Sequence, residues 1–398
     1  MAMVFGWCIF LMSVIGHTEW WVMAVNRSHA LKIRAGTLRK FRSVHDVAVL
    51  LYPFLLLTLT GLGPDSLLRG GDWSSQTPLT RQVVFWTSLG IIPLLLGILR
   101  WQLFRRHEFR AADERAHHDV QRSAGTTSPP TTDEAADVRG PRPHLLRKVP
   151  GNEILNLEVN SKRVQISRNG HHSREPKSPL RIVHFSDLHF IGCPGEAYYR
   201  FVAQEVERLQ PDLILFTGDL IDQEDLLSLA IDIWKPLTTI APCYFILGNH
   251  DWRYDFERIR SEFSKSGWVC VTGRLEEVEV KGRRILVGGS EMPWMGQWPP
   301  QVRETVADLK LLLCHSPDHH RWARRAGYDL MLSGHTHGGQ VVLPVIGPVY
   351  SPSLYGVSYV SGLFSLGSLT LHVSRGIGAK DPLRLRCPPE LTCLNVEC

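Results

Sequence analysis

The sequence lacks any C-x-x-C pair, although it contains eight cysteines in 398 residues. That absence excludes a zinc ribbon and a thioredoxin-type redox motif. A strong charge of one sign is also missing, because the formal net charge is only +5, and hydrophobic (44%) and charged (21%) residues occur at ordinary globular levels. The chain is therefore neither disordered overall nor dominated by disulfides. Cysteines such as Cys243 and Cys314 lie in apolar runs, which favours buried, reduced thiols in a reducing compartment.

Long apolar runs occur almost only before residue 100. Residues 47–63 and 82–99 are uncharged, and each is close to the ~17 to 25 residues that a spanning helix needs. The run over 1–25 is interrupted by Glu19 and lacks the basic start of a signal peptide, so it predicts a third, weaker span. An acid near mid-membrane costs ~2.5 to 3.5 kcal/mol, and we therefore expect Glu19 and His17 to face other helices or the membrane interface.

Basic residues flank these runs unevenly. Up to Arg42, the first loop contains only basic charges: Arg27, Lys32, Arg34, Arg39, Lys40 and Arg42. The second loop is balanced, with Asp65, Arg69, Asp72 and Arg81, whereas arginines follow the third run at 100, 105, 106, 110 and 115. By the positive-inside rule, the first loop and everything after the third run are cytoplasmic. We expect a multi-pass protein of the inner (cytoplasmic) membrane whose downstream domain faces the cytoplasm.

The rest of the chain divides into a linker and a folded domain. Residues 105–150 are polar and Pro-rich, which predicts a flexible linker. From 151 to 398, short β-rich runs alternate with amphipathic helical segments such as 197–210 and 256–267. Strands that are apolar almost throughout are buried on both faces, so helices should cover both sides of the sheets. We predict an α/β catalytic domain over 151–398, preceded by a membrane region over 1–104 with two or three transmembrane helices.

Five short polar segments each follow a predicted strand: S-D-L-H, T-G-D-L-I-D, L-G-N-H-D, C-H-S-P-D and S-G-H-T-H-G-G. In layered α/β folds, functional residues gather in loops beyond the carboxyl ends of strands. The segments offer three oxygen ligands and four imidazoles: Asp187, Asp219, Asn249, His189, His315, His335 and His337. That number exceeds the ligands of one tetrahedral catalytic ion. With no Cys among them, the set predicts two divalent ions of Mn, Fe or Zn.

Such a pair of ions suits the hydrolysis of a phosphoester. Two ions ~3.5 to 4 Å apart acidify a shared water and neutralise phosphoryl oxygens. We therefore expect attack by a hydroxide bound to a dinuclear centre on a phosphodiester or pyrophosphate bond. A lone Asp-x-His or loop histidine is more often part of a solvated turn, but five such segments at strand ends favour a site. Glycines beside them are expected to let the backbone turn sharply: Gly218, Gly248, Gly334, Gly338 and Gly339.

In order, the motifs D-x-H, G-D-x-x-D, G-N-H-D, H and G-H-x-H resemble those of the calcineurin-like metallophosphoesterase superfamily, over about residues 180–397. The resemblance implies a four-layer α/β/β/α sandwich with a dinuclear centre at the strand ends. It divides the ligands as follows: Asp187, His189 and His337 bind one metal, Asn249, His315 and His335 bind the other, and Asp219 bridges both. It also implies that His250 stabilises or protonates the leaving oxygen. Asp222 either orients His250 or is a surface acid that starts the next helix.

The C-terminal S-R-G-x-G and C-P-P-E segments, Ser374–Gly378 and Cys387–Glu390, resemble those of a bacterial membrane-associated phosphodiesterase-like branch. Some members with this pattern process lipid A precursors. Gln223 stands where protein phosphatases of the superfamily have an Arg, which disfavours a protein phosphatase. UDP-2,3-diacylglucosamine pyrophosphatases typically have Arg at the position of His250, so this subgroup is not a direct match, and a similar role in lipid A synthesis is kept only as an alternative. Arg375 faces either the substrate or a structural ion pair.

The expected partners are the membrane and a phosphoester or pyrophosphate substrate that is lipid-linked or nucleotide-linked. Nucleic acid is not expected, because no basic cluster is interleaved with aromatic residues. A nuclease of the same superfamily is disfavoured for the same reason. A non-catalytic metal-binding membrane scaffold is the alternative outside enzymes, and the presence of every ligand of the set disfavours it.

Overall fold

The structure is a computed structural model that describes residues 1–61, 63, 65–115, 126–127, 145–146, 148–166, 178–191 and 193–398. The chain forms two compact units, Met1–Ala111 with Val345–Ser358, and Ala112–Pro344 with Tyr359–Cys398. Much of the predicted linker over 105–150 lies outside the described residues, and its flexibility stays a prediction.

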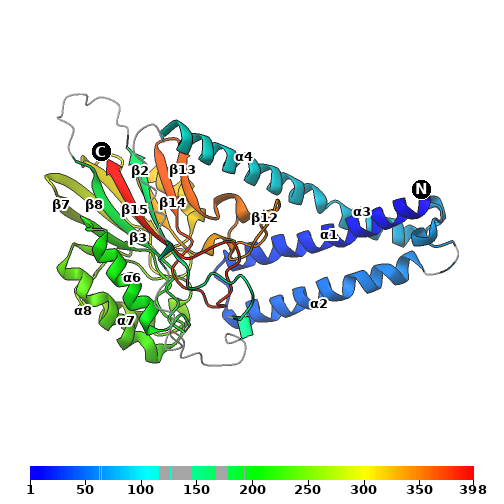
Figure 1. Ribbon diagram of the computed structural model, residues 1–398, viewed down its shortest axis with the longest axis horizontal. Helices are drawn as coiled ribbons and strands as arrows, with labels where there is room; N and C mark the ends of the chain where they lie inside the picture. Colours follow the sequence, from blue (N-terminus) through cyan, green and yellow to red (C-terminus); the bar gives the residue numbers. More distant parts are fainter. Residues whose placement is uncertain are drawn as a thin grey trace. The chain divides into compact units, whose positions relative to one another are not determined.

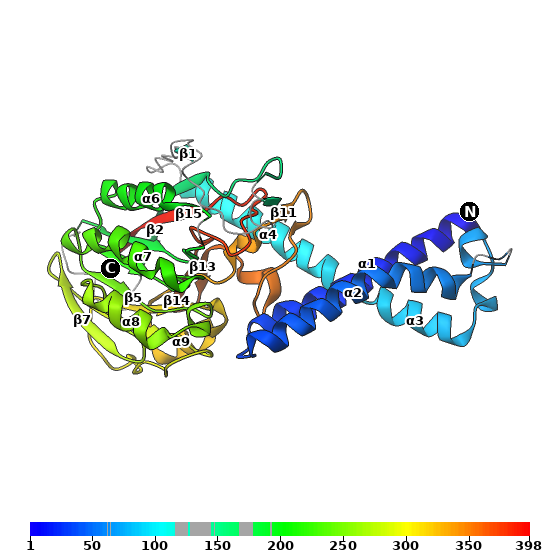
Figure 2. The same ribbon diagram turned by 90° about the horizontal axis from the view of Figure 1, so that it is seen from below.

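The first unit contains the helices α1 (Ala2–His29), α2 (Ala35–Thr60), α3 (Pro78–Ser88) and most of α4 (Ile91–Arg115). Figures 1 and 2 show α1, α2 and α3 running alongside one another. In the described part of the chain, three segments are long and apolar enough to cross a membrane: Ala2–His29, Gly36–Thr60 and Pro78–Leu103. The helix α1 continues without a break through Glu19.

Small residues and hydroxyl groups determine the packing of these helices. A Cβ atom on Gly90 would collide with the carbonyl group of Gly16, so α1 and the α3–α4 junction approach backbone to backbone. The expected helix over 82–99 is accordingly interrupted at this junction. The Ser13 hydroxyl lies 2.7 Å from that of Tyr52 and 2.6 Å from that of Thr87. Three helices thereby satisfy one another's polar groups, as an apolar surrounding requires.

The second unit contains two mixed β-sheets. In spatial order, the first consists of β1 (Thr126–Thr127), β2 (Leu157–Gln165), β15 (Glu390–Glu397), β3 (Leu180–Phe185), β4 (Leu213–Phe216), β5 (Cys243–Phe245) and β6 (Val269–Cys270). The second consists of β13 (Gly362–Leu366), β14 (Leu369–Val373), β10 (Leu330–Ser333), β9 (Leu309–Cys314), β8 (Arg283–Ser290) and β7 (Leu275–Val280).

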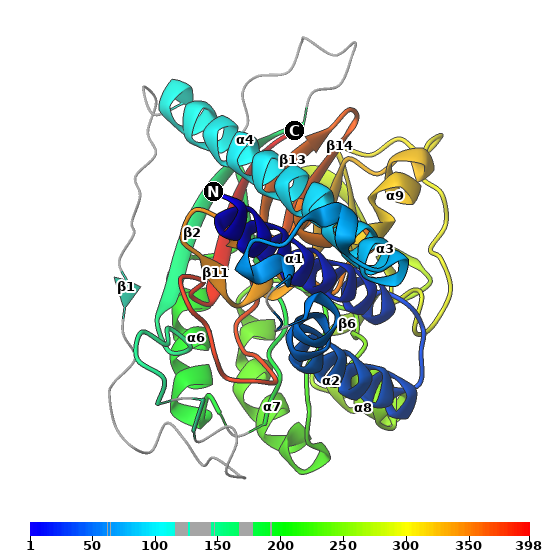
Figure 3. The same ribbon diagram turned by 90° about the vertical axis from the view of Figure 1, so that its right-hand side faces the viewer.

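Successive side chains of a strand point to opposite faces of its sheet, so the core is divided into layers. In β3, Ile182 belongs to the apolar cluster between the two sheets, whereas Val183 belongs to the cluster beneath the helices. That second cluster packs against α6 (Glu196–Arg208), α7 (Leu227–Trp234) and α8 (Phe256–Lys265). The helix α9 (His320–Ala326) contacts β14 on the other side of the unit (Figure 3). The predicted four-layer α/β/β/α arrangement is confirmed.

Parallel pairing brings the five motifs to the same ends of the strands. The pairs β3–β4, β4–β5 and β9–β10 are all parallel. Each of these five strands is entirely or almost entirely buried, and each leads at its carboxyl end into one of the polar segments. Among the strands that the apolar runs do not predict are β2, β7 and β13. The strand β7 reads LEEVEV and is an edge strand with half of its side chains polar, so it offers no apolar run.

Candidate metal centre

The loops at these strand ends hold non-glycine residues in left-handed backbone conformations. The backbone φ is 54° at Asp187, 47° at His189, 60° at Asp219, 71° at His335 and 52° at His337. Such conformations are uncommon for residues with a Cβ atom and persist only where the surroundings enforce them, which happens mainly at functional sites. Five of the seven predicted ligands share this feature.

Two glycines allow the loops to approach each other closely. A Cβ atom on Gly248 would collide with the carboxylate of Asp219, and one on Gly334 would collide with Ser186 and Asp187. Neither glycine has a positive φ. Their role is thus close approach between loops, not the sharp turn that the sequence suggested.

The first cluster consists of Asp187, His189, Asp219 and His337, whose ligand atoms all lie within 4.8 Å of one another. The Nε2 atoms of His189 and His337 are 3.0 Å apart. The His189 Nε2 atom is 3.5 Å from Asp219 Oδ2, and the His337 Nε2 atom is 3.4 Å from Asp187 Oδ1. Two imidazole nitrogens and two carboxylates therefore point to a common centre.

The second cluster consists of Asp219, His315 and His335, and Asp219 belongs to both. The His315 Nε2 atom is 3.4 Å from Asp219 Oδ2 and 3.1 Å from Asn249 Oδ1. The Nε2 atom of His335 is buried and has no hydrogen-bond partner in the structure. A buried, unpartnered acceptor beside a carboxylate and an amide oxygen suits a metal ligand. All seven predicted ligands thus meet in two adjoining clusters.

The outer nitrogens of two histidines show how the rings are oriented. The Nδ1 atom of His189 lies 2.7 Å from Asp222 Oδ2, and the Nδ1 atom of His315 lies 2.7 Å from the carbonyl oxygen of Thr217. When Nδ1 donates to these oxygens, Nε2 keeps its lone pair and faces the cluster. Metal-binding histidines are held in this way, so the donor set fits divalent metals.

Asp222 contacts two histidines at once. Its other oxygen, Oδ1, lies 2.6 Å from the Nδ1 atom of His250. The Asp222 carboxylate thus lies within hydrogen-bond distance of both His250 and His189, and sequence reasoning missed the contact with His189. Asp222 is not a surface acid, because its side chain is only 5% exposed. The side chain of His250 is 13% exposed.

The cluster has a strongly negative electrostatic character. Burial favours the neutral ring of His189, but the carboxylates of Asp222, Asp187 and Asp219 together outweigh it and raise the pKa of His189 to about 10. Burial likewise opposes charge on His315, yet Asp219 raises its pKa to about 9. Although burial disfavours the Asp219 carboxylate, His315 and His250 hold its pKa well below the usual range. Raised histidine pKa values and a lowered carboxyl pKa are typical of a negatively charged site, which attracts cations.

Asp251 joins two of the loops through their backbones. Its carboxylate accepts hydrogen bonds from the N–H groups of Leu220 (3.0 Å), Ile221 (3.1 Å) and Gly248 (2.9 Å). Burial, reinforced by the nearby charge of Asp219, raises the pKa of Asp251 to about 7. The G-D-x-x-D and G-N-H-D loops are thereby tied together. The motif contains Asp251, but nothing in the sequence shows that it accepts from the other loop.

The C-terminal loop packs against the D-x-H loop. The N–H of Gly378 donates to the carbonyl oxygen of Asp187 (2.7 Å). The fully buried guanidinium of Arg384 donates to the carbonyl oxygens of Arg375 (2.7 Å) and Gly378 (2.6 Å) and lies 3.5 Å from Nδ1 of His337. Sequence reasoning missed Arg384, because no local pattern distinguishes it from a surface arginine.

Arg375 forms a structural ion pair. Its guanidinium is 2.9 Å from Glu158 and 3.5 Å from Glu390, and its side chain is 17% exposed. Of the two roles that the sequence left open for Arg375, the structure therefore favours the ion pair.

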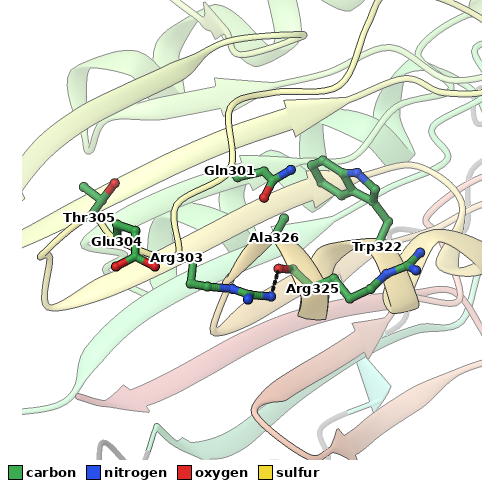
Figure 4. Close-up of a pocket in the computed structure, with 7 residues that line it drawn as sticks. All are labelled: Gln301, Arg303, Glu304, Thr305, Trp322, Arg325 and Ala326. Atoms are coloured by element: carbon green, nitrogen blue, oxygen red, sulfur yellow. Dashed lines mark hydrogen bonds between the residues drawn. The ribbon is translucent and has the colours of Figure 1, made fainter.

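A surface pocket of this unit does not coincide with the cluster. Figure 4 shows its lining, which consists of Gln301, Arg303, Glu304, Thr305, Trp322, Arg325 and Ala326. Arg303 donates a hydrogen bond to the carbonyl oxygen of Arg325 (2.6 Å). The lining includes a single carboxylate and no histidine, so it has no set of donors for a metal.

Comparison with known proteins agrees with this geometry. The sequence profile of the calcineurin-like phosphoesterase family matches residues 180–339. Phosphodiesterase YaeI of Escherichia coli (strain K12) is 31% identical over 229 residues, which cover 56% of this chain and 84% of that protein. The chain belongs to the calcineurin-like phosphoesterase family.

Two further relatives of this phosphoesterase extend the comparison. The uncharacterized metallophosphoesterase YkuE of Bacillus subtilis (strain 168) is 31% identical over 229 residues, or 55% of this chain and 79% of that protein. A transmembrane protein with metallophosphoesterase domain from Danio rerio is 24% identical over 270 residues, or 60% of this chain and 56% of that protein. The predicted family and enzyme class, a phosphoester hydrolase that uses divalent metals, are confirmed. The three apolar helices and the relative from Danio rerio indicate membrane association.

Metal binding is expected to release protons at neutral pH. The raised pKa values of His189 and His315, about 10 and about 9, keep both rings protonated there in the metal-free protein. A metal requires the unprotonated nitrogen, so it displaces these protons and its apparent affinity increases with pH. Calorimetric titration with Mn²⁺ in two buffers of different ionisation enthalpy measures the release. Equal heats in both buffers would contradict this expectation.

The substitution Asp251→Ala is expected to destabilise the second unit. It leaves three backbone N–H groups without their acceptor, and a buried unsatisfied donor costs ~1 to 3 kcal/mol. We expect a loss of about 3 kcal/mol in the free energy of unfolding, measured by urea denaturation of the full chain in detergent. The matched control is Asp232→Ala, an exposed acid on α7 that pairs with Arg200 at the surface. Equal urea midpoints for the two variants would refute the role of Asp251.

Proposed function

We propose that this protein is a multi-pass enzyme of the inner membrane that cleaves a phosphodiester or pyrophosphate bond on the cytoplasmic side. One observation carries the proposal: the carboxylate of Asp219 belongs to both of two adjoining, buried ligand clusters. A shared carboxylate is the arrangement that two neighbouring divalent ions require, and such pairs serve phosphoester hydrolysis.

The ligands divide between two ions in the way that the family motifs imply. We assign Asp187, His189 and His337 to one ion, Asn249, His315 and His335 to the other, and Asp219 to both. The oxygen and nitrogen donors suit Mn, Fe or Zn. When bound, the ions would acidify a water molecule and neutralise the phosphoryl oxygens.

His250 is assigned the leaving-group side of the reaction. Its Nδ1 atom is held by Asp222 at 2.6 Å, which leaves Nε2 to donate a proton to the departing oxygen. Burial lowers the pKa of His250, while the charge of Asp222 opposes that shift and stabilises the protonated ring. Asp222 thus acts through His250 and through His189, as a positioning residue.

A phosphodiester or pyrophosphate is favoured over a phosphomonoester. A monoester carries a second negative charge, which the protein phosphatases of the superfamily bind with an Arg after G-D-x-x-D. In this chain that position is Gln223, and the guanidinium of Arg375 forms ion pairs with Glu158 and Glu390. The name of the relative from Escherichia coli, a phosphodiesterase, agrees with this preference.

The membrane region suggests where the substrate is found. The basic loop after α1 supports a cytoplasmic position for the end of the first span. The arginines after the third span support a cytoplasmic position for the end of that span. An enzyme anchored in this way meets lipid-linked substrates readily. We therefore propose a lipid-linked phosphoester or pyrophosphate, and a nucleotide-linked glycolipid of the kind that lipid A synthesis uses is the narrower alternative.

Two substitutions separate metal binding from catalysis. We expect Asp219→Ala to lose both bound metal and turnover, because it removes the shared ligand. We expect His250→Ala to keep its metal and to lose turnover by about 10² to 10⁴, the contribution of a positioned proton donor. Metal content by mass spectrometry and hydrolysis of bis(p-nitrophenyl) phosphate are the measurements, with Asp232→Ala as the control. Full activity in either site variant would count against the assignment.

The substrate class is tested with the full chain in lipid nanodiscs loaded with Mn²⁺. We expect faster hydrolysis of bis(p-nitrophenyl) phosphate than of p-nitrophenyl phosphate. We also expect a nucleotide-linked glycolipid in the bilayer to be cleaved faster than its water-soluble deacylated analogue. Preference for the monoester would refute the diester assignment, and equal rates for the glycolipid and its analogue would refute a lipid-linked substrate.

A further inference from the structure

The segment Val345–Ser358 groups with the apolar helices, although it lies in the sequence between the metal-binding motif at His337 and the strand β13. Its sequence is VIGPVYSPSLYGVS, which contains no charged residue, two tyrosines and several apolar side chains. It includes the short strand β12 (Gly347–Pro348), which Figure 1 labels near the end of α1. We call it the 345–358 segment.

The 345–358 segment contacts the helices at one end of the apolar spans. The N–H of Ser351 donates to the side-chain oxygen of Asn26, at 3.1 Å, within the last turn of α1. The side-chain amide of Gln102 donates to the carbonyl oxygen of Val345, at 2.8 Å, one residue before the third span ends at Leu103. Both contacts are therefore at the boundary of the apolar region.

Aromatic rings also lie at this boundary of the apolar region. A Cβ atom on Gly347 would collide with the indole of Trp101, so the backbone of the segment lies directly on this ring. The ring of Tyr350 packs edge-on against His29, with 6.1 Å between centroids. Tryptophan and tyrosine are the residues that concentrate at membrane–water interfaces, where an apolar ring with a polar edge is stable.

Beside these contacts, the segment exposes apolar side chains. Val345 is 74% exposed, Leu354 is 43% exposed and Ile346 is 37% exposed. Exposed basic residues are near these contact residues in the sequence, at the same end of the spans: Arg27, Lys32 and Arg34 follow Asn26, and Arg100 precedes Trp101. Apolar side chains that are continuous with spanning helices and flanked by basic residues match the headgroup region of an anionic bilayer.

We propose that the 345–358 segment lies in the headgroup region of an anionic phospholipid bilayer, with Val345 and Ile346 inserted at the level where the third span ends. The proposal rests on the membrane anchoring in the proposed function and adds a second point of attachment. That attachment comes from the part of the chain that carries the hydrolase motifs.

The proposed attachment point is close in sequence to a ligand of the candidate metal centre, and this closeness bears on the kind of substrate. Val345 follows His337 by eight residues, and at about 3.3 to 3.6 Å per residue their Cα atoms are separated by about 29 Å at most. A ligand of the candidate metal centre is thus only eight residues along the chain from the proposed lipid contact. This favours a substrate whose scissile phosphoester belongs to a lipid or is linked to one.

The test measures the depth of single labels in the bilayer. The two exposed cysteines are replaced by Cys8→Ser and Cys398→Ser, and the six remaining cysteines are buried. Val345→Cys is labelled with a small fluorophore in the full chain, in nanodiscs of equal parts phosphatidylcholine and phosphatidylglycerol. Quenching by nitroxide-bearing lipids is compared with quenching by acrylamide in water. Ile346→Cys is the second variant, in case Val345→Cys does not fold.

Two control positions show the quenching expected in lipid and in water. Leu99, 55% exposed within the third span, reports lipid contact, and Val306, 79% exposed in the second unit, reports contact with water. We expect lipid quenching at Val345 and Ile346 to exceed that at Val306 several-fold, with weaker quenching by acrylamide.

Three results would overturn the proposal. Water-like behaviour at 345 and 346, with lipid contact at Leu99, would refute the interfacial segment and leave the membrane anchor intact. Water-like behaviour at Leu99 as well would refute the anchor in the proposed function too. Protection of 345 and 346 from both quenchers would show that another protein surface covers the segment.

Discussion

The buried carboxylate of Asp219 is the constraint on which the rest of the site depends. It has a left-handed backbone, it is 1% exposed, and it belongs to both ligand clusters. The loop around it is fixed by Asp251 from the G-N-H-D loop, and the adjoining Gly248 has no space for a side chain. Strained backbone and converging carboxylates are costly without a cation. The two sheets compensate for this free-energy cost, because five buried strands hold the loops together at their carboxyl ends.

Much of this arrangement could be predicted from the sequence. Apolar runs such as those of β3, β4 and β9 identify buried strands, and a polar motif directly after each is sufficient to place the ligands at one edge. What escaped prediction acts between distant parts of the chain. The second contact of Asp222 and the buried Arg384 depend on packing that no local pattern records. The break at Gly90 depends on its approach to Gly16, which a count of apolar residues does not reveal.

In the function that we propose, the helical unit and the 345–358 segment both attach the enzyme to the membrane. The spans alone would anchor the enzyme through its N-terminal part. The 345–358 segment contacts Asn26 and Gln102, near the boundary of the apolar region, and it closely follows the motif that contains His337 in the sequence. The same chain thus combines a candidate metal centre with a segment for which we propose contact with lipid headgroups, and this combination agrees with the proposed lipid-linked substrate.

The central claim is that two divalent ions share Asp219. Anomalous diffraction from crystals of the full chain grown with Mn²⁺, recorded on both sides of the metal's absorption edge, tests it most directly. We expect two anomalous peaks for each chain, with Asp219 between them, His189 and His337 beside one, and His315 and His335 beside the other. A single peak, or peaks away from Asp219, would contradict it.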